Sequence, residues 1–506
     1  MAHAGGTAGK SPLTRFTARL AAVWLAAIML PIPCGAARAA SALSESSEAC
    51  VECHRTVTPG IVADWEGGVH AKTTLGAALG RPAGTRRMSS LDIPSELRDA
   101  VVGCFECHGR NPQGHPDTFE HFGKSIHVVV TPADCGTCHG AEVAQYGGSK
   151  KAHAVGNLRD NPTYHALVTA LTSTRSVAGH QVKHGASSEG ARATSCFACH
   201  GTEVKVKGTK TVSSSVGDVI VPVLEGWPNV GVGRINPDGT RGACTSCHPR
   251  HGFSIEIARK PHTCSQCHLN PDTPAWEVWA ESKHGNITLS DGHGWDWRAV
   301  PWVPGRDFRA PSCAACHMAG LAAADGSEIA ARSHDFGSRL WVRIFGLIYS
   351  HPQPRSGRTA GIRNEDGTGL PTSFAGRPAS EFLIDAGEQL RRKERMRSVC
   401  RACHSSSWAD GHFARMDSAV AEADTMVRAA TVLMQSVWKA GKASPANPFD
   451  EEPEYAWMRQ WLFYANSVRY AAAMGGPDYA GFKNGWFAMN ENLEKLRKAA
   501  GFGIKR

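Results

Sequence analysis

Residues 244–268 read CTSCHPRHGFSIEIARKPHTCSQCH, and this stretch decides how the chain can fold. The pattern Cys-x-x-Cys-His occurs in it twice, at Cys244–His248 and at Cys264–His268. The same pattern occurs eight times in the whole chain, and its sixteen cysteines are all the cysteines beyond Cys34. Two thiols three positions apart can each bond one vinyl group of a haem, and the adjacent histidine can bind the iron. The sequence therefore predicts eight covalently attached c-type haems.

The predicted attachment sites comprise paired thiols and proximal histidines. The thiols are Cys50, Cys53, Cys104, Cys107, Cys135, Cys138, Cys196, Cys199, Cys244, Cys247, Cys264, Cys267, Cys313, Cys316, Cys400 and Cys403. The proximal iron ligands are His54, His108, His139, His200, His248, His268, His317 and His404. Zinc sites or disulfides are the alternatives for paired cysteines, but neither explains a histidine after every second cysteine. Haem attachment explains both residue types.

The first 39 residues are typical of a secretory signal peptide. Arg15 and Arg19 precede an apolar run over residues 20–33, and the small residues Ala37 and Ala39 follow it. The run is too short and too interrupted by proline to span a membrane. Removing residues 1–39 lowers the net charge from +9 to +5, and haem propionates would lower it further. We therefore expect a periplasmic protein without a nucleic-acid partner.

A second set of histidines is expected to provide the distal axial ligands of the haem irons. Apart from His3, fifteen histidines lie outside the motifs, and seven of them recur in polar contexts, most of them one or two residues after Ser, Lys or Arg. These candidates are His70, His127, His153, His184, His251, His284 and His334. Neutral imidazole is the usual second ligand of an electron-transfer haem. Seven candidates for eight irons predict one open iron.

Other histidines leave that count open. They are His115, His121, His165, His180, His262, His293, His351 and His412. If one of them binds the eighth iron, every haem is fully ligated and the chain is an electron conduit without a catalytic site. This is the alternative to a catalytic function.

The order of the motifs resembles the octahaem hydroxylamine oxidoreductase family. The densest similarity is Cys-His-Pro-Arg-His-Gly-Phe-Ser at 247–254, Ile-Ala-Arg-Lys-Pro at 257–261, Asn-Pro-Asp at 270–272 and Glu-Ser-Lys-His-Gly at 281–285. Cys-His-Gly-Thr at 199–202 is similar to the fourth, catalytic haem of that family. The lysine-ligated Cys-x-x-Cys-Lys motif of other octahaem families does not occur in the sequence.

The resemblance implies roles for particular residues. The fourth haem, at Cys196–His200, would bind substrate at its open face, and seven bis-histidine haems would carry electrons. In the family an Asp-His pair lies over the catalytic iron, whereas this chain has Asp272 followed by Thr273. We expect Asp272 to handle substrate protons, but a threonine hydroxyl cannot titrate near neutral pH. Oxidative members also carry a tyrosine, from a neighbouring subunit, bonded to the catalytic porphyrin, and Tyr470 lies near the right place.

The chain is expected to be mainly α-helical, with a multihaem cytochrome c fold. Residues 40–375 hold seven motifs among many Gly and Pro residues, which predicts short helices and loops wrapped around the haems. Residues 376–506 hold the eighth motif and apolar positions spaced by three and four, which predicts a helical bundle. Its first seam is Val420, Ala423, Val427, Ala430, Met434 and Val437.

We therefore predict a periplasmic octahaem oxidoreductase that oxidises hydroxylamine or hydrazine at its fourth haem. Its electron partner would be a soluble or membrane-attached cytochrome c, and the resemblance implies a homotrimer. The alternatives are a nitrite or hydroxylamine reductase of the same family and the non-catalytic electron conduit.

Overall fold

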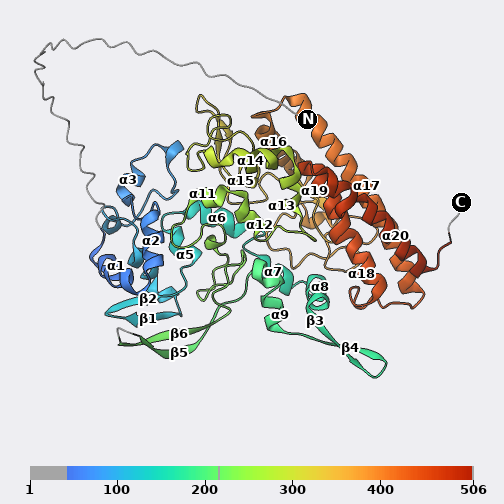
Figure 1. Cartoon of the computed structure of the whole chain (residues 1–506), viewed down its shortest axis with the longest axis horizontal. Coiled ribbons are helices and arrows are strands. Elements are labelled where there is room, and N and C mark those ends of the chain that lie inside the picture. The colour runs from blue at the N-terminus through green and yellow to red at the C-terminus, as the bar shows by residue number, and fades with distance from the viewer. Residues whose placement is uncertain (1–42, 215–216, 504–506) are drawn as a thin grey trace, which may run out of the picture. The chain divides into compact units, whose positions relative to one another are not determined.

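Short helices connected by long loops make up the part of the chain that carries the first seven motifs (Figure 1). The computed structural model describes residues 43–214 and 217–503. The expected signal peptide, residues 1–39, lies outside the described residues. Three helices begin at the first cysteine of a motif, namely α4 (Cys104–His108), α10 (Cys196–His200) and α15 (Cys313–His317). One helical turn brings both thiols and the histidine of a motif onto a short rigid segment.

The remaining helices of this part are also short. They are α1 (Glu45–Val57), α2 (Pro59–Gly67), α3 (Leu75–Leu79), α5 (Pro132–Gly136), α6 (Gly140–Gly148), α7 (Ala154–Arg159), α8 (Pro162–Thr172), α9 (Glu189–Ala193), α11 (Ile255–Arg259), α12 (Pro261–Ser265), α13 (Ala275–Glu281) and α14 (Lys283–Asp291). Single turns of 3₁₀-helix are η1 (Ala83–Thr85), η2 (Ser95–Leu97), η3 (Pro112–Gly114), η4 (Cys244–Ser246), η5 (Gly292–Gly294) and η6 (Ser380–Phe382).

Strands occur only as two-stranded antiparallel pairs within the described residues. The pairs are β1 (Thr118–His121) with β2 (Lys124–His127), β3 (Ser173–Ala178) with β4 (Gln181–Ser187), β5 (Lys205–Ser214) with β6 (Gly217–Glu225), β7 (Leu321–Ala322) with β8 (Glu328–Ala330), and β9 (Val342–Arg343) with β10 (His351–Pro352). The described chain thus has little regular sheet, and the expected mainly α fold is confirmed.

Within the described residues, helices of fifteen residues or more occur only near the C-terminus, where α17 to α20 form the expected bundle (Figure 1). The helical elements of this C-terminal part are α16 (Ala386–Arg401), α17 (Ser406–Lys439), α18 (Glu452–Arg459), η7 (Gln460–Tyr464), α19 (Ala465–Met474), η8 (Tyr479–Lys483) and α20 (Trp486–Ala500). The predicted seam of α17 is buried along its whole length, and Ala423, Val427, Ala430, Met434 and Val437 are each 0% exposed. Apolar burial of this stripe, at about 25 cal/mol per Å², is what holds α17 against α19 and α20.

The bundle core also takes in residues from the haem-bearing part of the chain. Leu347, Ile348 and Leu370 pack with α17 and α18 in one hydrophobic cluster. The guanidinium of Arg469 on α19 is fully buried, pairs with Asp424 on α17 and donates a hydrogen bond to the carbonyl of Ile348 at 2.9 Å. A buried charge requires such partners, so α19 is fixed in position against the loop that leads to β10. Within the described part of the chain, no helix combines the length and apolar character needed to cross a membrane.

Candidate haem-binding and catalytic site

Four motif histidines each face a second histidine ring, and the distance between ring centres is nearly the same in all four pairs. The ring centres are 6.2 Å apart for His54 and His121, 6.4 Å for His139 and His70, 6.1 Å for His108 and His127, and 6.0 Å for His404 and His284. A metal–imidazole bond of about 2 Å on each side, plus about 1 Å from each nitrogen to its ring centre, places two axial rings about 6 Å apart. These four pairs therefore fit the two axial positions of a haem iron.

Three of the seven predicted distal histidines, His70, His127 and His284, belong to these pairs. The partner of His54 is His121, which the sequence argument counted only among the other available histidines. His121 follows an acidic residue, Glu120, so it lacks the preceding Ser, Lys or Arg used to select candidates. The hairpin β1–β2 places it opposite His54.

The other four candidates have no ring contact with a motif histidine among the described residues. His334 is close enough to His248 that, after burial, it helps lower the pKa of His248 to about 4. The main-chain N–H of His251 donates to Asp64. His153 contacts the carbonyl of Gly147 through Nε2 at 3.0 Å. His184 lies on the exposed hairpin β3–β4. Their expected role as distal ligands stays a prediction.

Lys151 lies next to one of the four motif histidines that have no facing histidine ring among the described residues. Its Nζ lies 3.1 Å from Nε2 of His268 in the sixth motif. Burial and the charge of Lys151 lower the pKa of His200 to about 4, and burial, Arg339 and Lys151 lower that of His317 to about 4. One lysine therefore lies among the fourth, sixth and seventh motifs.

The fourth motif occupies α10, and the loop that carries Asp272 lies near it. Burial raises the pKa of the Cys196 thiol, and the charge of Asp272 raises it further. The contact with Cys267 raises the pKa of the Cys199 thiol, and burial and the charge of Asp272 add to that shift. The buried Thr273 donates a hydrogen bond from Oγ1 to Oδ2 of Asp272 at 3.3 Å. The main-chain carbonyl of Asp272 accepts a hydrogen bond from Nδ2 of Asn466 on α19 at 3.0 Å. Although Asp272 keeps an accessible face, burial raises the pKa of its carboxyl.

Tyr470 lies one helical turn beyond Asn466 on the same face of α19. Burial raises the pKa of its hydroxyl, Arg343 opposes that shift and Asp272 adds to it. Its ring centre lies 6.3 Å from that of Phe345. The structure therefore brings Asp272 and Tyr470 of the same chain together, whereas the resemblance implied a tyrosine from a neighbouring subunit.

Two residues near this site had no specific role assigned from the sequence, although His351 was counted among the other available histidines. Arg343 and His351 are register partners in the β9–β10 hairpin. Nδ1 of the buried His351 lies 2.7 Å from the Pro352 carbonyl, whereas Nε2 is buried without a partner. Burial, followed by the charge of Arg343, lowers the pKa of His351 to about 3, so the ring is neutral near pH 7. No spacing or motif singles out either residue, because the hairpin alone brings them together.

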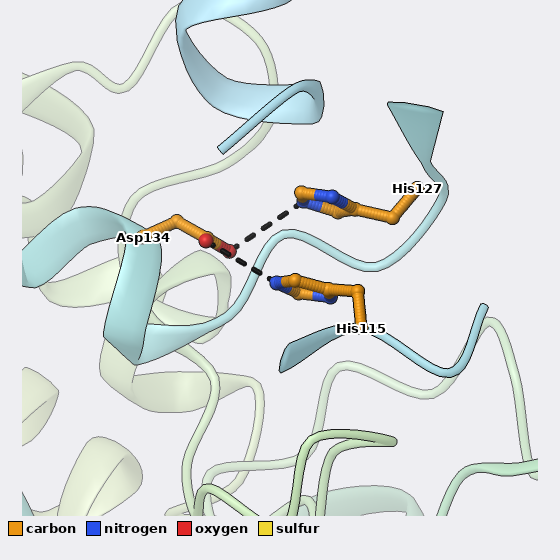
Figure 2. A group of neighbouring side chains, drawn as sticks. All are labelled: His115, His127 and Asp134. Carbon is orange, nitrogen blue, oxygen red and sulfur yellow. Dashed lines mark hydrogen bonds and ion pairs between the residues drawn. The ribbon is translucent and has the colours of Figure 1, made fainter. Parts of the chain in front are cut away.

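A separate buried cluster joins His115, His127 and Asp134 (Figure 2). The two imidazole rings stack with centres 3.5 Å apart, His115 Nε2 lies 3.2 Å from Asp134 Oδ1, and His127 Nε2 lies 3.6 Å from Asp134 Oδ2. Burial opposes the charge of Asp134, but contacts from His127, Thr131 and Asn111 outweigh it and lower its pKa to about 2. The carboxylate thus fixes the segment that contains the second and third motifs.

Replacing Asp134 with alanine should lower the free energy of unfolding by about 3–5 kcal/mol, since it removes one partner of a buried polar group. Chemical denaturation of the holoprotein near pH 7 measures this, and exposed Asp92→Ala is the control, expected within about 0.5 kcal/mol of wild type. A depressed carboxyl pKa stabilises the fold above the unfolded value and loses that contribution as pH falls toward the folded value. The difference between wild type and Asp134→Ala should therefore shrink as pH falls from about 4 to about 2. Equal stabilities at pH 7 would contradict this role.

Comparisons with known proteins agree with covalent haem attachment and with the fold. A family model described as seven times multi-haem cytochrome CxxCH matches residues 233–323, and one described as cytochrome c554 and c-prime matches residues 49–140 and 134–219. A solved structure described as a hypothetical multiheme protein is 43% identical, with a TM-score of 0.85 over 90% of this chain and 95% of that chain. The chain therefore belongs to the multihaem c-type cytochromes and binds c-type haems covalently.

Two proteins from Kuenenia stuttgartiensis place the fold within that class. A probable nitrite reductase-hydroxylamine oxidoreductase fusion protein is 24% identical over 433 residues, which are 80% of this chain. This chain spans only 39% of the length of that relative. A reducing HAO-like protein complex is 19% identical, with a TM-score of 0.55 over 90% of this chain and 85% of that chain. This likeness shows that the chain shares its fold with the HAO-like complex.

Proposed function

We propose that the chain is a periplasmic octahaem oxidoreductase that oxidises a small nitrogen compound, hydroxylamine or hydrazine, at its fourth haem. The observation that carries this proposal is the presence of a carboxyl group, a phenol and a guanidinium near Cys196–His200. Asp272 comes from the loop after the sixth motif, Tyr470 from α19, and Arg343 from the β9–β10 hairpin. A haem that only conducts electrons needs no such set of groups.

A haem held by Cys196, Cys199 and His200 supplies an iron for substrate binding and a redox centre at this position. Asp272 accepts protons from the N–H and O–H groups of the substrate, because these become acidic as electrons leave. Thr273 Oγ1 holds the carboxylate in one orientation. The Tyr470 hydroxyl, whose pKa burial raises, stays protonated and donates a hydrogen bond to the bound substrate.

The other seven motifs would hold haems that supply electron storage and transfer. The four opposed histidine pairs suit this role, since an iron with two imidazole ligands has no position for substrate. A cytochrome c would receive the electrons. Assembly as a homotrimer is part of the proposal, and the relative of similar fold is described as a protein complex.

Nitrite reduction is the second candidate, because the cationic Arg343 suits an anionic substrate. A paired assay on the purified holoprotein tests both directions. It follows hydroxylamine and hydrazine oxidation with an acceptor dye, and nitrite reduction with a reduced donor. Faster oxidation supports the main proposal, and faster nitrite reduction supports the second. Inactivity in every assay, with all irons low-spin and inert to carbon monoxide after reduction, would support the electron conduit.

Intact mass measurement tests the number of haems. The mature holoprotein should exceed the mass of the processed polypeptide by eight haem masses, because each of the eight motifs has both thiols and its histidine. Zinc-bound protein, or fully matured protein lacking two or more haems, would contradict this count. Alkaline pyridine spectra of the same sample provide an independent haem-to-protein ratio.

A further inference from the structure

We infer that Lys151 is the distal axial ligand of the haem at the sixth motif, in place of a histidine. The observation is the distance of 3.1 Å between Nζ of Lys151 and Nε2 of His268. In a Cys-x-x-Cys-His site the histidine binds iron, so the side chain that stands before its Nε2 faces the metal. The inference rests only on haem attachment at this motif, not on the proposed substrate.

The geometry allows an iron between the two nitrogens. Two axial nitrogens bonded to one metal lie about 4 Å apart, twice a metal–nitrogen bond of about 2 Å. The lysine would have to withdraw by about 1 Å, which its flexible four-carbon stem permits. Besides His268, Nζ of Lys151 lies 5.1 Å from the centre of the Phe336 ring. No carboxylate lies within ion-pair distance of Lys151 among the residues that the structure describes.

The local structure around Lys151 repeats that around His284, which faces the motif histidine His404. Both residues lie two positions after a buried serine, in Ser149-Lys150-Lys151 and in Ser282-Lys283-His284. Each serine ends a helix in extended conformation and donates from Oγ to the carbonyl three residues earlier, at 2.7 Å for Ser149 and 2.6 Å for Ser282. Lys151 therefore occupies the position equivalent to that of His284, whose imidazole faces His404 of the eighth motif.

His153, two residues further on, is the competing ligand. Its Nε2 is directed to the Gly147 carbonyl at 3.0 Å, and the residue immediately precedes α7. No ring contact brings it to a motif histidine among the described residues.

The position of Lys151 also has a consequence for electron flow, which rests on the proposed function. The sixth motif touches the fourth, because Sγ of Cys199 contacts the Gln266 carbonyl at 3.8 Å, and axial-ligand identity sets haem potential. The lysine would set the potential of the haem beside the catalytic one.

The test uses near-infrared magnetic circular dichroism and paramagnetic resonance of the oxidised holoprotein, which distinguish amine–imidazole from bis-imidazole ligation. Wild type should show one haem equivalent of the amine–imidazole type. Lys151→Leu should convert that equivalent to high spin, and Lys151→His should move it to the bis-imidazole position. Lys283→Leu, at an exposed lysine beside His284, is the matched control and should leave the spectra unchanged. His153→Asn, at the competing ligand, should leave the amine–imidazole equivalent in place.

Two results would overturn the inference. The first is a wild-type spectrum in which every low-spin haem is bis-imidazole. The second is a new high-spin haem in His153→Asn that Lys151→Leu does not produce. If Lys151→Leu does not accumulate as folded protein, the wild-type spectrum and the change to bis-imidazole ligation in Lys151→His still test whether Lys151 binds the iron. Neither readout depends on turnover, so a failure here leaves the proposed nitrogen chemistry untouched.

Discussion

Replacing Asp272 with asparagine is expected to lower kcat/KM for hydroxylamine by about 10²–10⁴-fold, which is the usual contribution of a positioned acid–base group. Asparagine keeps the shape and the hydrogen bond from Thr273 but cannot take up a proton. The loss should therefore come with normal haem content and normal folding. Steady-state oxidation with an acceptor dye measures it, alongside the haem-to-protein ratio.

The pH profile separates a chemical role of Asp272 from a structural one. Burial raises the pKa of this carboxyl above the ordinary aspartate value of 3.8, and only the ionised form accepts a proton. Wild-type activity should therefore fall as pH decreases, along a limb that lies above pH 3.8, and Asp272→Asn should lack that limb. Asp325→Asn, in an exposed turn, is the matched control and should behave as wild type. Unchanged turnover in Asp272→Asn would remove Asp272 from the site.

Replacing Thr273 with histidine is expected to raise hydroxylamine oxidation by up to about 10²-fold, at the lower end of acid–base contributions. Thr273 orients the carboxylate of Asp272 but cannot titrate near neutral pH, whereas imidazole can. The variant should also gain a limb in its pH profile near the ordinary histidine pKa of about 6.5.

Thr273 is buried, so the larger side chain needs a matched control. Thr273→Asn has a similar polar bulk without a titrating group and should not gain activity. A rapid wild-type rate that Thr273→His leaves unchanged would show that protons leave by another route, through water or His293. The prediction of eight haems does not depend on that outcome.

Several features of this chain could be predicted because they depend on residues close together in sequence. The thiols and proximal histidine of each motif lie within five residues, so the spacing alone specifies covalent haem attachment. The seam of α17 follows from helical periodicity, because residues three and four apart share one face. The place of Asp272 after the sixth motif followed from resemblance, and the structure places it near the fourth.

The pairing of the axial ligands was harder to predict, because three of the four pairs join residues more than sixty positions apart. His121 lies far from His54 in sequence and was counted only among the other available histidines. Lys151 is two residues from the predicted ligand His153, and only the end of α6 shows which of the two reaches His268. Arg343 and His351 lie side by side because their strands pair, and no sequence motif predicts that pairing.

The sequence by itself determined the class of this protein, the number of its attachment motifs and its helical C-terminal bundle. Thioether formation and helical periodicity are local, since each needs only a few residues at set spacings. The tertiary structure alone decided which side chains face five of the motif histidines and which groups surround the fourth motif. Those choices depend on contacts between separate chain segments, such as those that hold α19, where Arg469 is buried against Ile348 and Asp424. No local rule contains that information, because it comes from how the whole chain packs.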